Sequence, residues 1–168
     1  LHITSKNDHP ERLKAFESIL LKCIELGIDQ LIIAGDLFDE TLQDFADFEK
    51  ICAKKKYCDV QIHIIPGNHD AQLINDQIVS ANVQVYDQPD WIEIEKGVNF
   101  LLVPYQKHKS MGQAVQEHLE GRENLDPWWA IVGHGDWLQG LRNMNPFEPG
   151  VYMPLSRRDL QLLNPDLV

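Results

Sequence analysis

Residues 60–70, VQIHIIPGNHD, contain a hydrophobic run that stops at a proline and a glycine and is followed by three polar residues. A short, unbroken apolar run is typical of a parallel strand that is buried on both faces. Asn68, His69 and Asp70 come directly after it, at the carboxyl end of the predicted strand. An amide, an imidazole and a carboxylate are groups that bind metals or transfer protons, so this strand end is a candidate functional site.

Two other stretches repeat the pattern. DQLIIAG (29–35) leads into Asp36 and Asp39, and WWAIVG (128–133) leads into His134. Polar residues and glycines after a strand are common turn formers, and any one cluster alone favours that reading. In α/β proteins, however, ligands bind beyond the carboxyl ends of the strands. Three such clusters with different ligand types therefore predict one shared site.

The rest of the chain alternates between strand and helix patterns. The expected helices cover 8–27, 110–121 and 156–163, and a further helix follows residue 41; the expected strands cover 1–4, 29–35, 60–65, 83–86, 91–95, 98–103 and 128–133. Crossover helices in the first half and a hairpin around Gly97 in the second predict an α/β fold with two mixed sheets.

Composition narrows the class of protein. A chain of 168 residues suits one domain, and its apolar runs are too short to span a bilayer, so no membrane partner is expected. The three cysteines have no metal-type spacing, which favours reduced thiols and a cytoplasmic location. The net charge of −11 argues against tight non-specific binding to DNA. It does not exclude a phosphate substrate, because bound metal ions reverse the local field.

The three clusters offer oxygen and nitrogen ligands without a thiolate. Asp36 supplies a carboxylate, Asn68 an amide carbonyl and His134 an imidazole, a set that suits Mn, Fe or Zn. A carboxylate can also bridge two metal ions.

The remaining polar residues of the clusters predict supporting roles. His69 is placed to protonate a leaving alkoxide, and Asp70 could hold its imidazole in the required tautomer. Asp39 is expected to buttress the loop after the first buried strand. His2 and His63 each lie in an apolar stretch, and both are interpreted as hydrogen-bonded core histidines.

IIAGDLFD, IIPGNHD and AIVGHGD resemble, in order, the second, third and fourth motifs of the calcineurin-like metallophosphoesterases. The resemblance implies a four-layer α-β-β-α sandwich with two divalent metal ions at the strand ends, Mn being favoured over Fe, Zn or Mg. It implies that Asp36 bridges the metals, that Asn68 and His134 bind the second one, and that His69 is the general acid. A metal-bridging hydroxide would attack phosphorus in line.

Two departures from the family pattern bear on the site. The family's first motif, Asp-x-His, is replaced by adjacent Asp8 and His9, which could be ligands but also form a capping box with Glu11. Capping is the favoured interpretation. The family's last motif, Gly-His-x-His, does not follow Leu167. We expect residues 1–168 to form a single metallophosphoesterase domain that lacks a loop after Ser5 and a segment after Val168.

LHIT, GDLFD and the stretch PLSRRDLQLLNPDLV (154–168) look most like SbcD/Mre11-type DNA-repair nucleases. This resemblance implies hydrolysis of phosphodiester bonds in DNA, and a homodimer or an ATPase partner subunit. Two alternatives stay open: a phosphodiesterase or phosphatase for nucleotides or other small phosphoesters, and a degenerate member that binds its ligand without catalysis.

Overall fold

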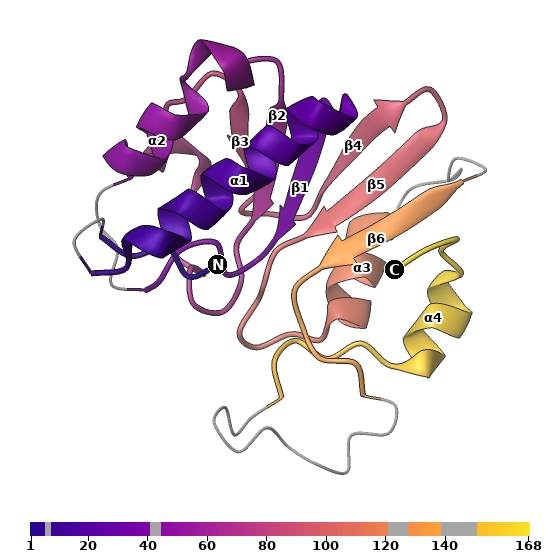
Figure 1. The fold of residues 1–168 in the computed structure, drawn as a ribbon. Helices are drawn as coiled ribbons and strands as arrows, with labels where there is room; N and C mark the ends of the chain where they lie inside the picture. Colours follow the sequence, from indigo (N-terminus) through magenta and orange to yellow (C-terminus); the bar gives the residue numbers. More distant parts are fainter. Residues whose placement is uncertain (6–7, 41–44, 121–127, 139–150) are drawn as a thin grey trace. The chain divides into compact units, whose positions relative to one another are not determined.

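The computed structural model describes residues 1–5, 8–40, 45–120, 128–138 and 151–168 (Figure 1). It divides into two compact units, unit 1 (residues 1–87) and unit 2 (residues 88–168), and each is described by itself.

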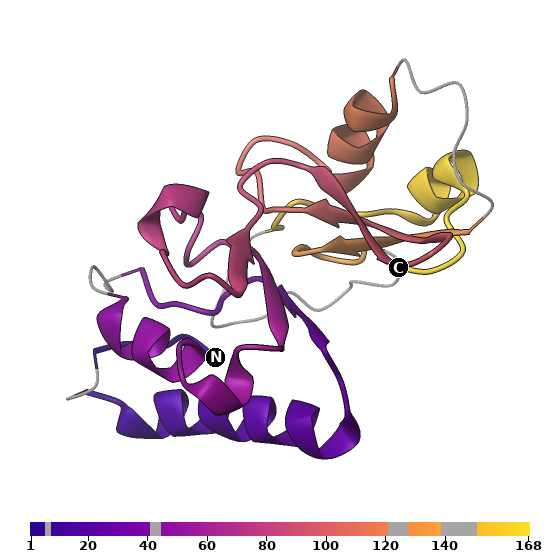
Figure 2. The ribbon, with the colours of Figure 1, turned by 90° about the horizontal axis from the view of Figure 1, so that it is seen from above.

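Unit 1 is built on a parallel sheet with the strand order β1-β2-β3. Its elements are α1 (Pro10–Leu26), β1 (Gln30–Ala34), α2 (Ala46–Cys52), the 3₁₀ turn η1 (Lys55–Tyr57), β2 (Gln61–Ile65), the 3₁₀ turn η2 (Asn75–Gln77) and β3 (Val83–Val85). Figure 2 shows α1 and α2 on the same face of this sheet.

The α1 helix forms because its apolar residues recur at helical spacing. Leu13, Phe16, Leu20 and Cys23 make one buried stripe against the sheet. Each fully buried large side chain stabilises the fold by about 2 kcal/mol. Gly27 ends the helix in the left-handed conformation (φ 66°), as the sequence predicts.

Residues of β2 alternate between the two faces of the sheet. Ile62 and Ile64 are buried under the helices. His63 points to the other face, where Nδ1 lies 3.0 Å from the hydroxyl of Tyr86 and Nε2 lies 2.8 Å from Oε1 of Gln30. The hydrogen bonding predicted for His63 is confirmed, but its side chain is only partly buried and is not a core residue as predicted.

Unit 2 is built on a mixed sheet with the strand order β4-β5-β6. Its elements are β4 (Asp90–Glu95), β5 (Val98–Val103), α3 (Met111–Leu119), β6 (Trp129–Gly133) and α4 (Arg157–Leu163). The β4–β5 pair is antiparallel and turns at Gly97 (φ 80°), whereas β5 and β6 are parallel.

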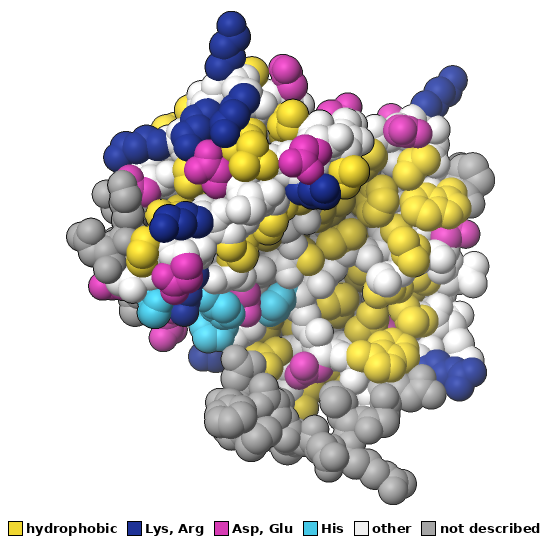
Figure 3. Space-filling model, viewed as in Figure 1, with side chains coloured by type: hydrophobic (Ala, Val, Ile, Leu, Met, Phe, Trp, Pro, Cys, Tyr) yellow, Lys and Arg dark blue, Asp and Glu magenta, His cyan; other side chains and the backbone are white. Residues whose placement is uncertain are grey.

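The second sheet is also covered by helices on one face. Leu101 and Ile131 point into the core that contains residues of α3. Phe100 and Val132 lie on the opposite face and line a hydrophobic hollow of about 270 Å³. Hydrophobic side chains gather over these strands in Figure 3.

The predicted α/β class with two sheets is confirmed, and within each unit helices cover one face of the sheet. The first sheet is wholly parallel in its described strands, because β1, β2 and β3 are joined by crossovers rather than hairpins. Residues 1–4 are not a full strand, since Ile3 makes a single bridge to Phe38. No helix in the described part of the chain is long and apolar enough to cross a membrane.

Candidate metal centre and active site

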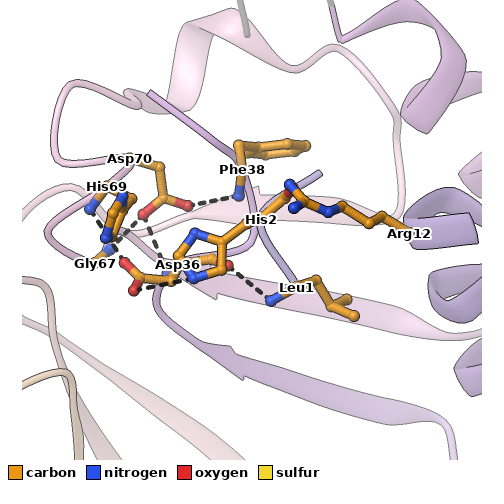
Figure 4. A network of polar contacts seen from close by, with 8 residues as sticks. All are labelled: Leu1, His2, Arg12, Asp36, Phe38, Gly67, His69 and Asp70. Atoms are coloured by element: carbon orange, nitrogen blue, oxygen red, sulfur yellow. Dashed lines mark hydrogen bonds and ion pairs between the residues drawn. The ribbon is translucent and has the colours of Figure 1, made fainter. Parts of the chain in front are cut away.

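The carboxylate of Asp70 joins the ends of β1 and β2 (Figure 4). One oxygen accepts hydrogen bonds from the backbone N–H groups of Gly67 (2.6 Å) and Asp36 (3.2 Å), and the other accepts one from Phe38 (3.0 Å). Asp70 is buried, with 7% of its surface exposed, so these bonds form largely out of water. All three bonds come from backbone N–H groups, so the Asp70 carboxylate holds the two loops together.

Asp36 sits in a strained turn. Gly35 and Asp36 have φ angles of 87° and 53°, and a left-handed residue other than glycine costs about 1 kcal/mol or more. The turn places the Asp36 carboxylate under the next loop, where Oδ1 accepts a hydrogen bond from the backbone N–H of His69 (3.1 Å). A Cβ atom on Gly67 would overlap the Asp36 carboxylate and amide, so the close approach of these loops requires glycine there.

His2 was predicted to lie in the core, but the structure places it beside Asp36 and His69. Its backbone N–H donates to the carbonyl of Asp36 (3.0 Å), and its own carbonyl accepts a hydrogen bond from the guanidinium of Arg12. The His2 ring lies edge-on to the ring of His69, with centroids 4.6 Å apart, and Nε2 is 3.8 Å from Oδ2 of Asp36. The side chain is 38% exposed.

The core prediction for His2 is wrong because the strand that it assumed is not formed. Pairing with the loop after β1 is limited to the bridge at Ile3, and His2 has a left-handed backbone (φ 48°). The left-handed turn at His2 sets where its ring lies, and no pattern in residues 1–5 predicts that turn.

The donor atoms of unit 1 fit the metals that the family resemblance implies. One ligand atom each from His2, Asp36 and His69 lie within 4.8 Å of one another. Two imidazole nitrogens and a carboxylate oxygen are a donor set suited to Mn, Fe or Zn. Asn68 lies in the same turn, between Gly67 and His69, and is partly buried. The structure therefore brings Asp36 and His69 of the predicted residues close together, with His2 beside them and Asn68 in the same turn.

Asp39 holds the loop after β1 through its main chain. Its backbone N–H donates to the carbonyl of Ile3 (2.9 Å), which continues the pairing of residues 1–3 with residues 36–39. Asp39 also lines a cavity of about 270 Å³ that reaches His69 and Asp70. The predicted role of Asp39 as a loop support is consistent with these contacts.

His134 directly follows β6 in unit 2 and is partly buried. Two residues on, Asp136 fixes the returning loop, because its Oδ2 accepts from the N–H of Tyr152 (2.7 Å) and its own N–H donates to the Tyr152 carbonyl (2.8 Å). A Cβ on Gly135 would overlap the carbonyls of Tyr152 and Met153. Gly135 and Asp136 thus shape this loop, and the shared site of His134 and Asp36 remains a prediction.

Asp8 and His9 are exposed at the start of α1. Asp8 accepts a hydrogen bond from the hydroxyl of Ser5 (2.6 Å), while Nδ1 of His9 lies 2.9 Å from Oε1 of Glu11. The predicted capping box is wrong, because the N-cap is His9, which makes no side-chain cap bond. Among the residues that the structure describes, neither Asp8 nor His9 belongs to the donor group of His2, Asp36 and His69.

The ends of two parallel strands present a carboxylate and an imidazole, and the N-terminal stretch adds a second imidazole, so the protein is an α/β protein with a metal-type donor group. The family model of the calcineurin-like phosphoesterases matches residues 1–168, and the chain belongs to this family.

Two relatives match a short part of the chain. They are the DNA double-strand break repair proteins Mre11 of Methanosarcina acetivorans (34% identical) and Methanosarcina mazei (31% identical), each over 62 residues. The match covers 35% of this chain and 10% of each relative. Among solved structures, the Pseudomonas putida nuclease MPE aligns at 21% identity with a TM-score of 0.41, covering 78% of this chain and 56% of that one.

Proposed function

We propose that this protein is a metal-dependent phosphoesterase that hydrolyses phosphodiester bonds, with DNA as its substrate. The observation that carries the proposal is the junction of β1 and β2, where Asp70 fixes two loops. In these loops, a carboxylate oxygen of Asp36 and a ring nitrogen of His69 lie within 4.8 Å of each other. Family membership supports the phosphoester chemistry, and the names of the two Mre11 relatives support DNA.

The metal ions would be held in unit 1 by Asp36, Asn68 and His2; a ligand role for His134 remains a prediction from the sequence. When bound, divalent metals supply activation of water and neutralisation of charge on the phosphoryl oxygens. Mn is the favoured metal because the donors are carboxylate, amide and imidazole groups without a thiolate.

His69 is proposed to transfer the proton that the departing alcohol needs. In the reaction, an oxygen from water bonds to phosphorus and releases a proton to solvent, and the bond from phosphorus to the leaving oxygen breaks. His69 gives its proton to that leaving oxygen and is reprotonated from solvent. The backbone of His69 is anchored by the bond from its N–H to Asp36 Oδ1, and its ring packs on His2. These contacts restrict where the imidazole can lie, which is what a proton donor requires.

A second candidate is hydrolysis of nucleotides or other small phosphoesters. The net charge of −11 favours it, since a long polyanion is repelled more strongly than a small one. A third candidate, a binding protein without catalysis, would use the same donor group for a metal and a ligand.

One experiment separates the three. The purified protein is incubated with Mn²⁺ and either an end-labelled single-stranded DNA or bis-(p-nitrophenyl) phosphate, beside Asp36→Asn and the exposed control Asp76→Asn. DNA cleavage that Asp36→Asn lacks and Asp76→Asn retains supports the proposal. Cleavage of the small ester alone supports the second candidate. Bound Mn²⁺ without hydrolysis of either substrate supports the third.

A further inference from the structure

The cavity beside His69 has no role in the chemistry described so far. It measures about 270 Å³ and is formed within unit 1 by residues on three segments: the loop after β1, the start of α2, and the stretch from His69 to η2. Pockets for whole small molecules run from about 300 to 1,000 Å³, so this cavity suits one ring system of a larger substrate.

One wall of the cavity is aromatic. Phe45 lines it and meets Phe38 edge to face, with ring centroids 4.8 Å apart. Phe38 is 1% exposed and packs in turn on Phe48, so Phe45 rests on a fixed base while remaining partly exposed itself. Leu73, at 3% exposed, adds an aliphatic surface. A planar ring can pack on such a wall without a specific hydrogen bond.

The polar groups of the cavity are acids and amides. Asp39 and Glu40 supply carboxylates, and Gln72 and Gln77 supply side-chain amides. Gln77 is oriented by the bond that its Oε1 accepts from the N–H of Ile74 (3.0 Å), which leaves its NH₂ as the donor end. Among the described residues that line the cavity, none is a lysine or an arginine. A phosphate is therefore disfavoured there, and a group that donates hydrogen bonds is favoured.

Nucleobases offer both the planar ring and the hydrogen-bond donors that this cavity favours. Every base has a flat face that stacks on an aromatic side chain. Cytosine, adenine and guanine also carry an exocyclic amine, and carboxylates accept hydrogen bonds from such amines. Thymine lacks this group.

We propose that the cavity beside His69 binds one nucleobase of the substrate and prefers bases with an exocyclic amine. The base stacks on Phe45 and donates its amine hydrogens to the carboxylates of Asp39 and Glu40. Because His69 lines the same cavity, a base held there would belong to a nucleotide next to the bond that is cut. This inference rests on the proposed function, since it names a subsite for that reaction.

The test compares three substrates that release p-nitrophenolate: the p-nitrophenyl esters of deoxycytidine monophosphate and of thymidine monophosphate, and methyl p-nitrophenyl phosphate, which has no base. In the presence of Mn²⁺, kcat/KM is expected to be about tenfold higher for the deoxycytidine ester than for the methyl ester, in line with the strength of base stacking. The thymidine ester should fall between them.

Variants test each wall of the cavity. Phe45→Leu should lower the ratio of deoxycytidine ester to methyl ester about tenfold, because it removes the ring but keeps an apolar side chain. Phe45→Tyr keeps the ring and should restore the ratio. Glu40→Gln should reduce the preference for cytosine over thymine, whereas Glu25→Gln, on the exposed surface of α1, should leave that preference at the wild-type value.

The outcomes distinguish the pocket from the reaction. Equal kcat/KM for the three esters would overturn the pocket while the phosphodiesterase proposal stands. If no ester is hydrolysed, the proposed function is judged by the DNA cleavage assay, and the pocket is judged by saturation-transfer NMR with deoxycytidine and thymidine. Stronger transfer to deoxycytidine that weakens in Phe45→Leu supports the pocket. No transfer to either nucleoside overturns it.

Discussion

Nε2 of His2 lies 3.8 Å from Oδ2 of Asp36, and both residues have a left-handed backbone, with φ angles of 48° and 53°. The same two residues are joined by a backbone hydrogen bond from His2 to Asp36 (3.0 Å). Strained backbones of this kind persist only where surrounding contacts hold them, and they cluster at functional sites. Here the two strained residues place an imidazole beside a carboxylate. This arrangement supports the proposal that His2 and Asp36 bind the same metal ion.

Replacing His2 by alanine is expected to weaken Mn²⁺ binding about tenfold, because one of the proposed metal ligands of unit 1 is lost while Asp36 and Asn68 remain. The dissociation constant can be measured by isothermal titration calorimetry. His108→Ala removes an exposed histidine and serves as the matched control. An unchanged Mn²⁺ affinity in His2→Ala would show that His2 only packs against His69.

Replacing His69 by alanine separates proton transfer from metal binding. A proton donor contributes about a hundredfold or more to turnover, so kcat should fall by that amount while Mn²⁺ affinity stays within a few-fold of wild type. Parallel kinetic and calorimetric measurements on the same preparation give both numbers. A loss of Mn²⁺ binding comparable to that of Asp36→Ala would instead make His69 a metal ligand.

Replacing Asp70 by alanine should destabilise unit 1 strongly. Three backbone N–H groups, those of Asp36, Phe38 and Gly67, would lose a charged acceptor in a buried place. We expect the free energy of unfolding to fall by about 3 kcal/mol or more, since buried donors left unpaired cost about 1–3 kcal/mol each. Urea denaturation measures this, with the exposed Asp76→Ala as control. A decrease of less than about 1 kcal/mol in the free energy of unfolding would contradict the role of Asp70 in holding the two loops together.

His63 predicts a pH dependence of stability. Burial lowers the pKa of His63 below its ordinary value of about 6.5, so the unfolded chain takes up a proton at a higher pH than the folded chain does. The unfolded state therefore binds more protons in the interval between the two pKa values, and stability rises with pH across it. The stability that neutral, partly buried His63 contributes is fully present above the pKa of His63 in the unfolded chain. It is lost as the pH falls toward the pKa of His63 in the folded chain.

The measurement is urea unfolding at pH 7.5 and at pH 5. Wild-type protein should be less stable at the lower pH, and His63→Gln should show a smaller difference because it cannot titrate. The partners that face His63, Gln30 and Tyr86, are uncharged at both values, so they add no titration of their own. An unchanged difference in His63→Gln would assign the effect to other groups.

The order of elements followed from local patterns. Helical spacing of Leu13, Phe16 and Leu20 was sufficient to predict α1, and the apolar runs before Gly35, Gly67 and Gly133 were sufficient to predict β1, β2 and β6. These patterns report which side chains are buried, and burial is the main stabilising force, so elements defined by it can be read from sequence.

The partners of individual polar groups could not be predicted in the same way. Asp8 was expected to cap α1, but it binds Ser5, and the helix begins after an uncapped His9. The competing bonds differ by about 1 kcal/mol, which is too little for a local sequence pattern to resolve.

By itself, the sequence determined that two strands end just before Asp36 and before Asn68-His69-Asp70, because hydrophobic runs and glycines specify where a strand stops. Only the tertiary structure decided that Asp70 holds the backbone of a loop 32–34 residues earlier and that His2 stands beside Asp36 and His69. Both relationships depend on which strands become neighbours. That choice is made by packing the whole sheet against its helices and leaves no signature in any short segment.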